Sequence, residues 1–280
     1  MTRELPSLLK RAATPLDQPR AIGGAFVSSK CGAAGSAIDG LRQSGALKLL
    51  FPRSRRAVEA VLINTAGGIT GGDRFDIQAH AGAGSQLTLT TQAAERAYGA
   101  QIGQTGKIRA RLRADKDSTL RWLPQETILY QDAALCRRLR ADLAPSARFL
   151  MVEPVLFGRR AMGEDPTRLQ FIDRIDVRRD GKPLYRDGTN LIGNAATLLD
   201  RPAIGGGARA MASLLWCAPE AGGKLDVVRN IIGKSGGASM LCADVMVARL
   251  LAEDGFMLRR SLLPLLDLLT ETSLPQSWRL

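Results

Sequence analysis

The sequence predicts a mainly β protein with two α-helices near the C-terminus, and three observations support this prediction. Short segments in which apolar and polar residues alternate recur between residues 58 and 178. Glycine-containing turn signals separate these segments. Apolar residues at helical spacing occur only after residue 219. The protein is therefore expected to be built from many short strands, followed by a small helical part.

The clearest strand lies at residues 107–113, where apolar side chains face one way and cationic side chains face the other. Residues 169–178 repeat the pattern, and Asp180-Gly181 after them is typical of a hairpin turn. A cationic strand face is usually solvated, but this one could instead meet an acidic partner. Further strands are expected at residues 58–64, 75–79, 86–91, 119–123, 126–130 and 148–156.

Two helices are predicted from apolar spacing in the last quarter of the sequence. The first covers residues 219–232 and ends at Gly233, and the second covers residues 255–270. Between them, residues 238–251 fit a strand or a helix, and Val245 and Val247 favour a strand. Residues 200–209, which contain three consecutive glycines, are expected to form a loop.

No shift in composition marks a domain boundary. Residues 1–20 are rich in proline and charge and are expected to be a flexible segment, whereas residues 21–280 are expected to fold as a single β-rich domain. The longest apolar stretch is far shorter than the ~20 residues that span a bilayer. With no apolar signal segment either, the protein is expected to be cytoplasmic, without contact to a membrane.

The sequence is strongly basic, with 39 Lys and Arg against 27 Asp and Glu. Such a surplus favours an anionic partner, although an arginine-rich composition alone would produce the same balance. Nucleic-acid binding is the alternative function that the charge allows. Aromatic residues make up only 5% of the chain and the arginines are scattered in pairs, so no nucleic acid is expected.

Several catalytic motifs appear in part and fail on their context. Residues 233–237 match G-x-S-x-G, but a predicted helix precedes them and the single histidine, His80, lies far upstream. One histidine also excludes sites built on several imidazoles. We therefore expect no enzymatic activity and no tightly bound cofactor.

The most unusual segment is residues 64–73, with the sequence Asn-Thr-Ala-Gly-Gly-Ile-Thr-Gly-Gly-Asp. Its glycine pairs predict a tight turn with positive φ or a close backbone approach. Asp73 then places a carboxylate at a rigid bend. On the residues alone a structural corner is favoured over a functional site, and its motif residues are Asn64, Gly67, Gly68, Gly71 and Gly72.

This segment and four others, in the same order along the chain, resemble the UreD (UreH) family of urease accessory proteins. The others are residues 89–98, 122–130, 156–164 and 274–278, the last departing from the family pattern at Gln276. The resemblance implies an elongated stack of short strands in a β-helix-like arrangement with two helices. It also implies a non-catalytic scaffold that joins UreF and the GTPase UreG, docks on apo-urease and offers a water-filled passage for nickel.

A transient nickel path requires weak oxygen ligands in a wet, negatively biased channel, because the ion must be released again. The candidates are the carboxylates in the family-like segments and, more weakly, the imidazole. Each of them could also be a surface or turn-capping group. They are Asp73, Glu95, Glu126, Glu164 and His80.

Overall fold

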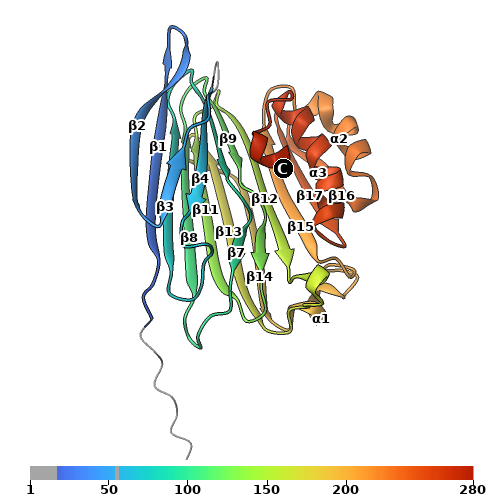
Figure 1. The fold of residues 1–280 in the computed structure, drawn as a ribbon. Coiled ribbons are helices and arrows are strands. Elements are labelled where there is room, and N and C mark those ends of the chain that lie inside the picture. Colours follow the sequence, from blue (N-terminus) through green and yellow to red (C-terminus); the bar gives the residue numbers. More distant parts are fainter. Residues whose placement is uncertain (1–17, 54–56, 280) are drawn as a thin grey trace, which may run out of the picture.

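The computed structural model describes residues 18–53 and 57–279, and within these residues the strands form two sheets that face each other (Figure 1). Residues 1–17 of the expected flexible segment lie outside the described residues. Sheet A has seven strands, in the order β14 (Lys182–Gly193), β13 (Leu169–Arg179), β11 (Ala134–Leu143), β8 (Gly106–Ala114), β5 (Arg74–Ala81), β1 (Ile22–Gly32) and β2 (Gly35–Gly45). Sheet B has ten, in the order β16 (Gly236–Cys242), β17 (Val245–Ala252), β15 (Ala210–Cys217), β12 (Arg148–Phe157), β9 (Thr119–Leu123), β6 (Gln86–Thr91), β4 (Val58–Asn64) and β3 (Leu47–Leu50), with β10 (Thr127–Leu129) and β7 (Glu95–Ala97) paired beside β12.

The central strands alternate between the sheets along the chain. β4, β6, β9 and β12 belong to sheet B, while β5, β8, β11 and β13 follow them in turn in sheet A. Neighbours within each of these series are parallel, so every pair of successive strands makes one coil of a two-sheet solenoid. The predicted β-helix-like stack is confirmed. Antiparallel strands extend both sheets at their ends.

Alternation along each strand places the main hydrophobic core between the two sheets. In sheet A, the parallel register aligns Ile77, Ala110, Leu139 and Ile175 in one row across four strands. All four side chains are buried, whereas the residues next to them in sequence face outward. Burial of such rows is the main driving force for stacking the coils.

The turn predicted at Asp180-Gly181 connects β13 to β14 in an antiparallel hairpin. Both residues have positive φ, 52° for Asp180 and 71° for Gly181. Positive φ at both central residues is the requirement of a type I′ turn, which matches the twist of the flanking strands. The hairpin prediction is confirmed.

Helices cover the outer face of sheet B near its C-terminal strands, visible at the right of Figure 1. α2 (Leu225–Ile232) and α3 (Gly255–Thr270) bury a second apolar cluster against β15 and β17, in which Leu262, Leu265 and Trp278 are fully buried. α3 has the predicted bounds. Asp254 caps it by accepting a hydrogen bond from the N–H of Met257.

The remaining C-terminal predictions are confirmed in part. α2 begins at Leu225 and not at residue 219, because a turn and the short helix η2 (Gly222–Lys224) precede it and glycines disfavour the α-helix. Residues 236–252 form strands β16 and β17, and residues 200–209 form the predicted loop. The pattern gave no indication of α1 (Ala195–Leu199). Further short helices are η1 (Arg160–Met162), η3 (Gly233–Ser235) and η4 (Gln276–Arg279).

Two further points concern the organisation of the chain. Sheet B contributes side chains to both apolar clusters, so we propose that residues 21–280 form a single domain. None of the helices in the described part of the chain is long and apolar enough to cross a membrane.

Candidate functional site

The glycine-rich bend, residues 64–73, carries the chain from β4 in sheet B to β5 in sheet A. Gly67 has φ of 76° and Gly72 has φ of 90°, both in the left-handed region. Gly68 is a close approach, because a Cβ atom there would lie 2.6 Å from the carbonyl oxygen of Arg96 and 2.3 Å from the Tyr98 ring. A Cβ atom on Gly71 would lie 2.8 Å from the side chain of Ala100. The bend is therefore a fixed corner of the solenoid.

Asp73 holds this corner together through the backbone. Its Oδ1 accepts a hydrogen bond from the N–H of Ala21 at 2.8 Å, and its Oδ2 accepts one from the N–H of Thr70 at 2.8 Å. The side chain is buried, with 4% of the residue exposed. Since each oxygen already has a backbone donor, Asp73 fixes the start of β1 against the turn that precedes β5.

Asn64 links the bend to Glu95 at the start of β7. The Asn64 Nδ2 donates to the carbonyl of Gly68 at 2.8 Å and to the Glu95 carboxylate at 3.0 Å. Burial raises the pKa of Glu95 to about 7, against the opposing effect of the hydrogen bond from Asn64. Glu95 therefore exchanges its proton close to neutral pH.

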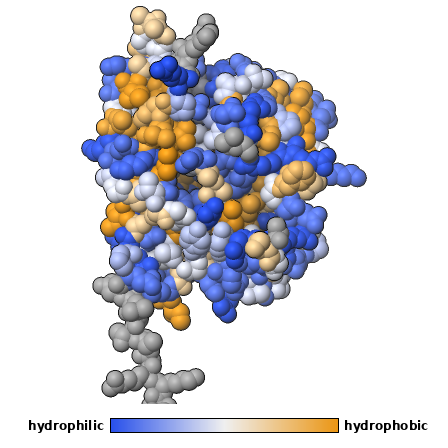
Figure 2. Space-filling view, viewed as in Figure 1, coloured by the Kyte–Doolittle hydropathy of each residue, from blue (hydrophilic) through white to orange (hydrophobic). Residues whose placement is uncertain are grey.

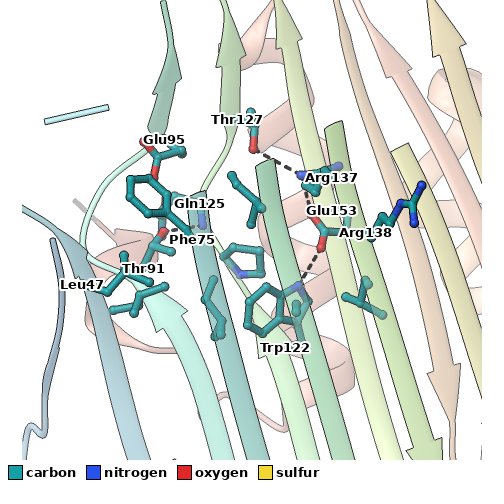
Figure 3. A pocket seen from close by; sticks show the side chains of 16 residues that line it. Leu47, Phe75, Thr91, Glu95, Trp122, Gln125, Thr127, Arg137, Arg138 and Glu153 are labelled. Atoms are coloured by element: carbon teal, nitrogen blue, oxygen red, sulfur yellow. Dashed lines mark hydrogen bonds and ion pairs between the residues drawn. The ribbon is translucent and has the colours of Figure 1, made fainter. Parts of the chain in front are cut away.

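Glu95 lies between two cavities. On one side is a pocket of about 160 Å³, lined by the bend at Asn64, Gly67 and Gly68. On the other is a cavity of about 50 Å³ between the two sheets, which Figure 3 shows with Glu95 at one side and Arg137 at the other. A cavity of that size has room for a few water molecules. Both cavities share Glu95, so its carboxylate stands at the boundary between the surface and the interior of the solenoid.

Polar groups converge at the inner end of this cavity in an otherwise apolar interior. Arg137 on β11 forms ion pairs with Glu153 on β12 at 2.5 Å and with Asp173 on β13 at 2.6 Å. It also donates to the hydroxyl of Thr127 at 3.2 Å, and the Trp122 indole N–H donates to Glu153 at 2.7 Å (Figure 3). We call Arg137, Glu153 and Asp173 the buried network.

The buried network contains two carboxylates and one guanidinium, all less than a tenth exposed. Burial raises the pKa of Glu153 to about 7, while Arg137 counteracts the rise. Burial alone would lower the pKa of Arg137, but Asp173 and Glu153 outweigh it and the pKa stays above its ordinary value. Glu153 is therefore the carboxylate of the network whose charge changes close to neutral pH.

The amide of Gln125 is a further polar group on this cavity. Its oxygen accepts a hydrogen bond from Arg259 on α3, whereas its buried Nε2 has no hydrogen-bond partner within the described residues. A buried amide nitrogen without a protein partner is normally satisfied by water. This observation agrees with a hydrated cavity.

The other predicted ligands lie away from the cavity. The buried Glu126 forms a two-pronged ion pair with Arg259, at 2.7 and 2.9 Å. Glu164 accepts from Arg159 and from the N–H of Gln131. His80 lies on the outer face of β5, with its Nε2 2.8 Å from Asp115.

Of the five candidates, the structure brings Asp73 and Glu95 to one place and leaves the other three apart. In the described residues no three His, Cys, Asp or Glu side chains are close enough to hold a metal ion together.

Sequence reasoning missed the buried network, although a signal was present. Arg137 and Asp173 occupy inward-facing positions, where the alternation of their strands otherwise places apolar residues, and Glu153 interrupts an apolar run. A charged residue in such a position is buried and must be paired. The fold and this network define the class of protein: a two-sheet β-solenoid with charged side chains enclosed between its sheets.

Comparison with known sequences identifies the family within this class. The family described as UreD urease accessory protein matches residues 23–279. A protein named urease accessory protein UreD from Roseobacter denitrificans is 69% identical over 273 residues, covering 98% of this chain and all of the relative. Proteins of the same name from Ruegeria sp. and Agrobacterium fabrum are 53% and 42% identical, over 94% and 96% of this chain and 91% and 95% of theirs. The chain belongs to the UreD family of urease accessory proteins.

Proposed function

We propose that this protein is a cytoplasmic, non-catalytic scaffold that acts with UreF and UreG on apo-urease and assists nickel insertion. The relatives are named as accessory proteins of urease, which supports a role in its maturation. The observation that carries the proposal is the position of Glu95, which lines both the surface pocket and the cavity between the sheets. Nickel is the cargo of this scaffold and not a resident cofactor.

The chemistry of Glu95 suits transfer better than storage. A carboxylate with a pKa of about 7 can lose its proton to bind a cation and regain it when the cation leaves. A single carboxylate with one amide neighbour binds a divalent ion weakly, because tight sites use several ligands. Weak binding is what passage requires, since an ion held tightly would not move on.

Beyond Glu95, the proposed route continues along Gln125 and Thr127 to Glu153. These groups supply oxygen atoms on the 50 Å³ cavity, which is large enough for water but narrow for a hydrated ion. The route therefore requires that the inter-sheet space widen when the protein is bound to its partners. Asp73 supports the entrance by fixing the bend, while Glu126, Glu164 and His80 are held elsewhere by their own partners.

Exposed apolar side chains support the role of a scaffold. Figure 2 shows apolar groups gathered at the upper left, over the region of β3 and β4, which the helices leave uncovered. Leu41 on β2 and Leu50 on β3 are 47% and 57% exposed. Contiguous exposed apolar surface is typical of protein-binding faces.

Co-purification tests the scaffold role most simply. The tagged full chain, expressed with the urease gene cluster, is expected to retain UreF, UreG and urease subunits, and its deletion should leave urease poor in nickel. Fully nickel-loaded urease in the deletion strain would contradict the proposal. Nucleic-acid binding remains the second candidate function because the outer face of sheet A is cationic. Binding of a DNA duplex to the full chain, compared with binding of an acidic peptide, distinguishes this function from the scaffold role.

A further inference from the structure

The outer face of sheet A concentrates positive charge. The outward-facing Lys and Arg side chains of β8 are exposed, as are Arg138 and Arg140 on β11, and the parallel register sets the two strands' side chains side by side. Arg138 on β11 is the register partner of Arg109 on β8 and of Arg174 on β13. We call these three residues the arginine row.

None of the three arginines forms an ion pair in the described structure, although Asp76 on β5 is the register partner of Arg109 at the end of the row. Among residues 18–53 and 57–279 no ion pair includes Arg109, Arg138 or Arg174, and Arg174 donates to the backbone carbonyls of Asp173 and Thr189. The next row differs, since Arg111 lies 3.7 Å from Asp76 and Arg140 forms a two-pronged pair with Asp142.

Like charges directly opposite on neighbouring strands are destabilising. Arg111 and Arg140 in the neighbouring row have carboxylate partners, whereas the three arginines of the arginine row form no ion pair in the described residues. An anionic partner that neutralises the arginine row would remove the repulsion. The row also borders a depression of about 440 Å³ on this face, which gives a partner a place to rest.

The spacing of the row selects the kind of partner. Neighbouring strands lie about 4.8 Å apart, so the row offers one guanidinium per ~4.8 Å. Side chains on one face of an α-helix recur at each turn, every ~5.4 Å, whereas those on one face of an extended strand recur at roughly 6.6 Å. A helix with one carboxylate per turn therefore fits the row better than an extended chain does.

Nucleic acid fits this face less well. Asp76 lies in the row, as the register partner of Arg109, and Asp176 lies in the next outward row, as the register partner of Arg140. Both carboxylates would repel a continuous polyanion that extends past the arginines. Tyrosine and tryptophan, on which single-stranded bases stack, are absent from the described outward positions of β5, β8, β11 and β13. Planar guanidinium groups pair readily with separate carboxylates.

We propose that the arginine row is the docking surface for an acidic α-helix of a protein partner. The helix crosses the strands of sheet A along the row and presents one carboxylate to each arginine. This inference goes beyond the proposed function, because it rests on the charges and register of sheet A and not on nickel transfer.

The test uses the full chain and a synthetic helical peptide with a glutamate at each turn along one face. A second peptide of the same composition has its glutamates spread around the helix, and a 20-base-pair DNA duplex is the third probe. Fluorescence anisotropy at two salt concentrations is expected to show at least fivefold tighter binding of the one-faced peptide than of the other two probes.

The triple variant R109Q/R138Q/R174Q is expected to bind the one-faced peptide about 30-fold more weakly, since each lost pair costs a few-fold in affinity. The matched control K48Q/K182Q/R201Q removes the same charge from exposed positions elsewhere and should leave binding within twofold. Equal binding of the two peptides, preferred binding of DNA, or equal loss in both triple variants would overturn the proposal. Circular dichroism of each variant verifies that the fold is retained.

Discussion

Arg137 and Arg138 are neighbours in the sequence and lie on opposite faces of sheet A. Arg137 points between the sheets, where two carboxylates, a threonine hydroxyl and an aromatic ring surround it. Arg138 points outward between two other arginines and has no carboxylate partner in the described structure. The same residue type therefore serves internal structure on one face and leaves charge available for recognition on the other.

The difference follows from the cost of burying charge. A buried ion must be paired, because its desolvation penalty is several kcal/mol. An exposed arginine is solvated and needs no partner within the protein, so its guanidinium stays available to pair with a bound molecule. Because neighbouring residues of a strand face opposite sides, Arg137 is buried and paired while Arg138 is exposed, a difference that the number of arginines alone does not reveal.

Truncation of Arg137 should produce the largest effect. Arg137→Ala leaves Glu153 and Asp173 buried without their cation, and the expected loss is about 3–5 kcal/mol in the free energy of unfolding. Arg138→Ala is the matched control and should change it by no more than ~0.5 kcal/mol. Urea denaturation measures both free energies of unfolding, and a similarly small loss for the two variants would show that the buried ion pairs of Arg137 do not stabilise the fold.

Substitutions in the glycine-rich bend, residues 64–73, should also reduce stability, because its backbone is closely packed. Gly68→Ala brings a Cβ atom to 2.6 Å from the carbonyl oxygen of Arg96, so the backbone must shift, at a cost of about 2–3 kcal/mol. Gly67→Ala meets no atom within 4 Å and should cost only the positive-φ penalty, about 1 kcal/mol. Thermal unfolding compares the two, and equal losses would mean that conformation and not close approach limits this corner.

The raised pKa of Glu95 should make the stability of the protein fall as the pH rises towards neutral. Burial raises the pKa of Glu95 to about 7 in the folded protein, so its folded state binds more protons than its unfolded state between pH 4.5 and pH 7. Its contribution to stability is therefore complete below pH 4.5 and is lost as the pH rises through 7, by roughly 3 kcal/mol. Glu95→Gln should flatten the profile measured between pH 5 and pH 8, whereas an unchanged slope would show that Glu95 titrates normally.

The arginine row should give the smallest effect on stability, with the opposite sign. Arg138→Gln removes repulsion from Arg109 and Arg174, so the free energy of unfolding should rise by a few tenths of a kcal/mol at low salt. The gain should shrink as salt screens the charges. A loss of stability would indicate that Arg138 has a structural partner after all.

Local features of the fold could be predicted from the sequence, while pairing between strands could not. Alternation identified the strand at residues 107–113 and its cationic face, and leucine spacing gave both ends of α3. The solenoid arrangement came from the family resemblance, since a period of two is the same for parallel coils and antiparallel sandwiches.

For the site, Glu95 was found because it lies in a family-like segment. Glu153 was missed because its partners Arg137 and Asp173 come from other strands, and only the register unites them.

We propose that Glu95 lies on the route by which nickel reaches urease. Glu95→Gln keeps an acceptor for Asn64 but removes the charge, and Glu59→Gln on the outer face of β4 is the matched control. In cells that express the urease gene cluster, Glu95→Gln is expected to form the accessory complex normally while the nickel content of purified urease falls about tenfold. The control should match the wild type. Full nickel loading with Glu95→Gln, in an intact complex, would show that nickel does not need the Glu95 carboxylate.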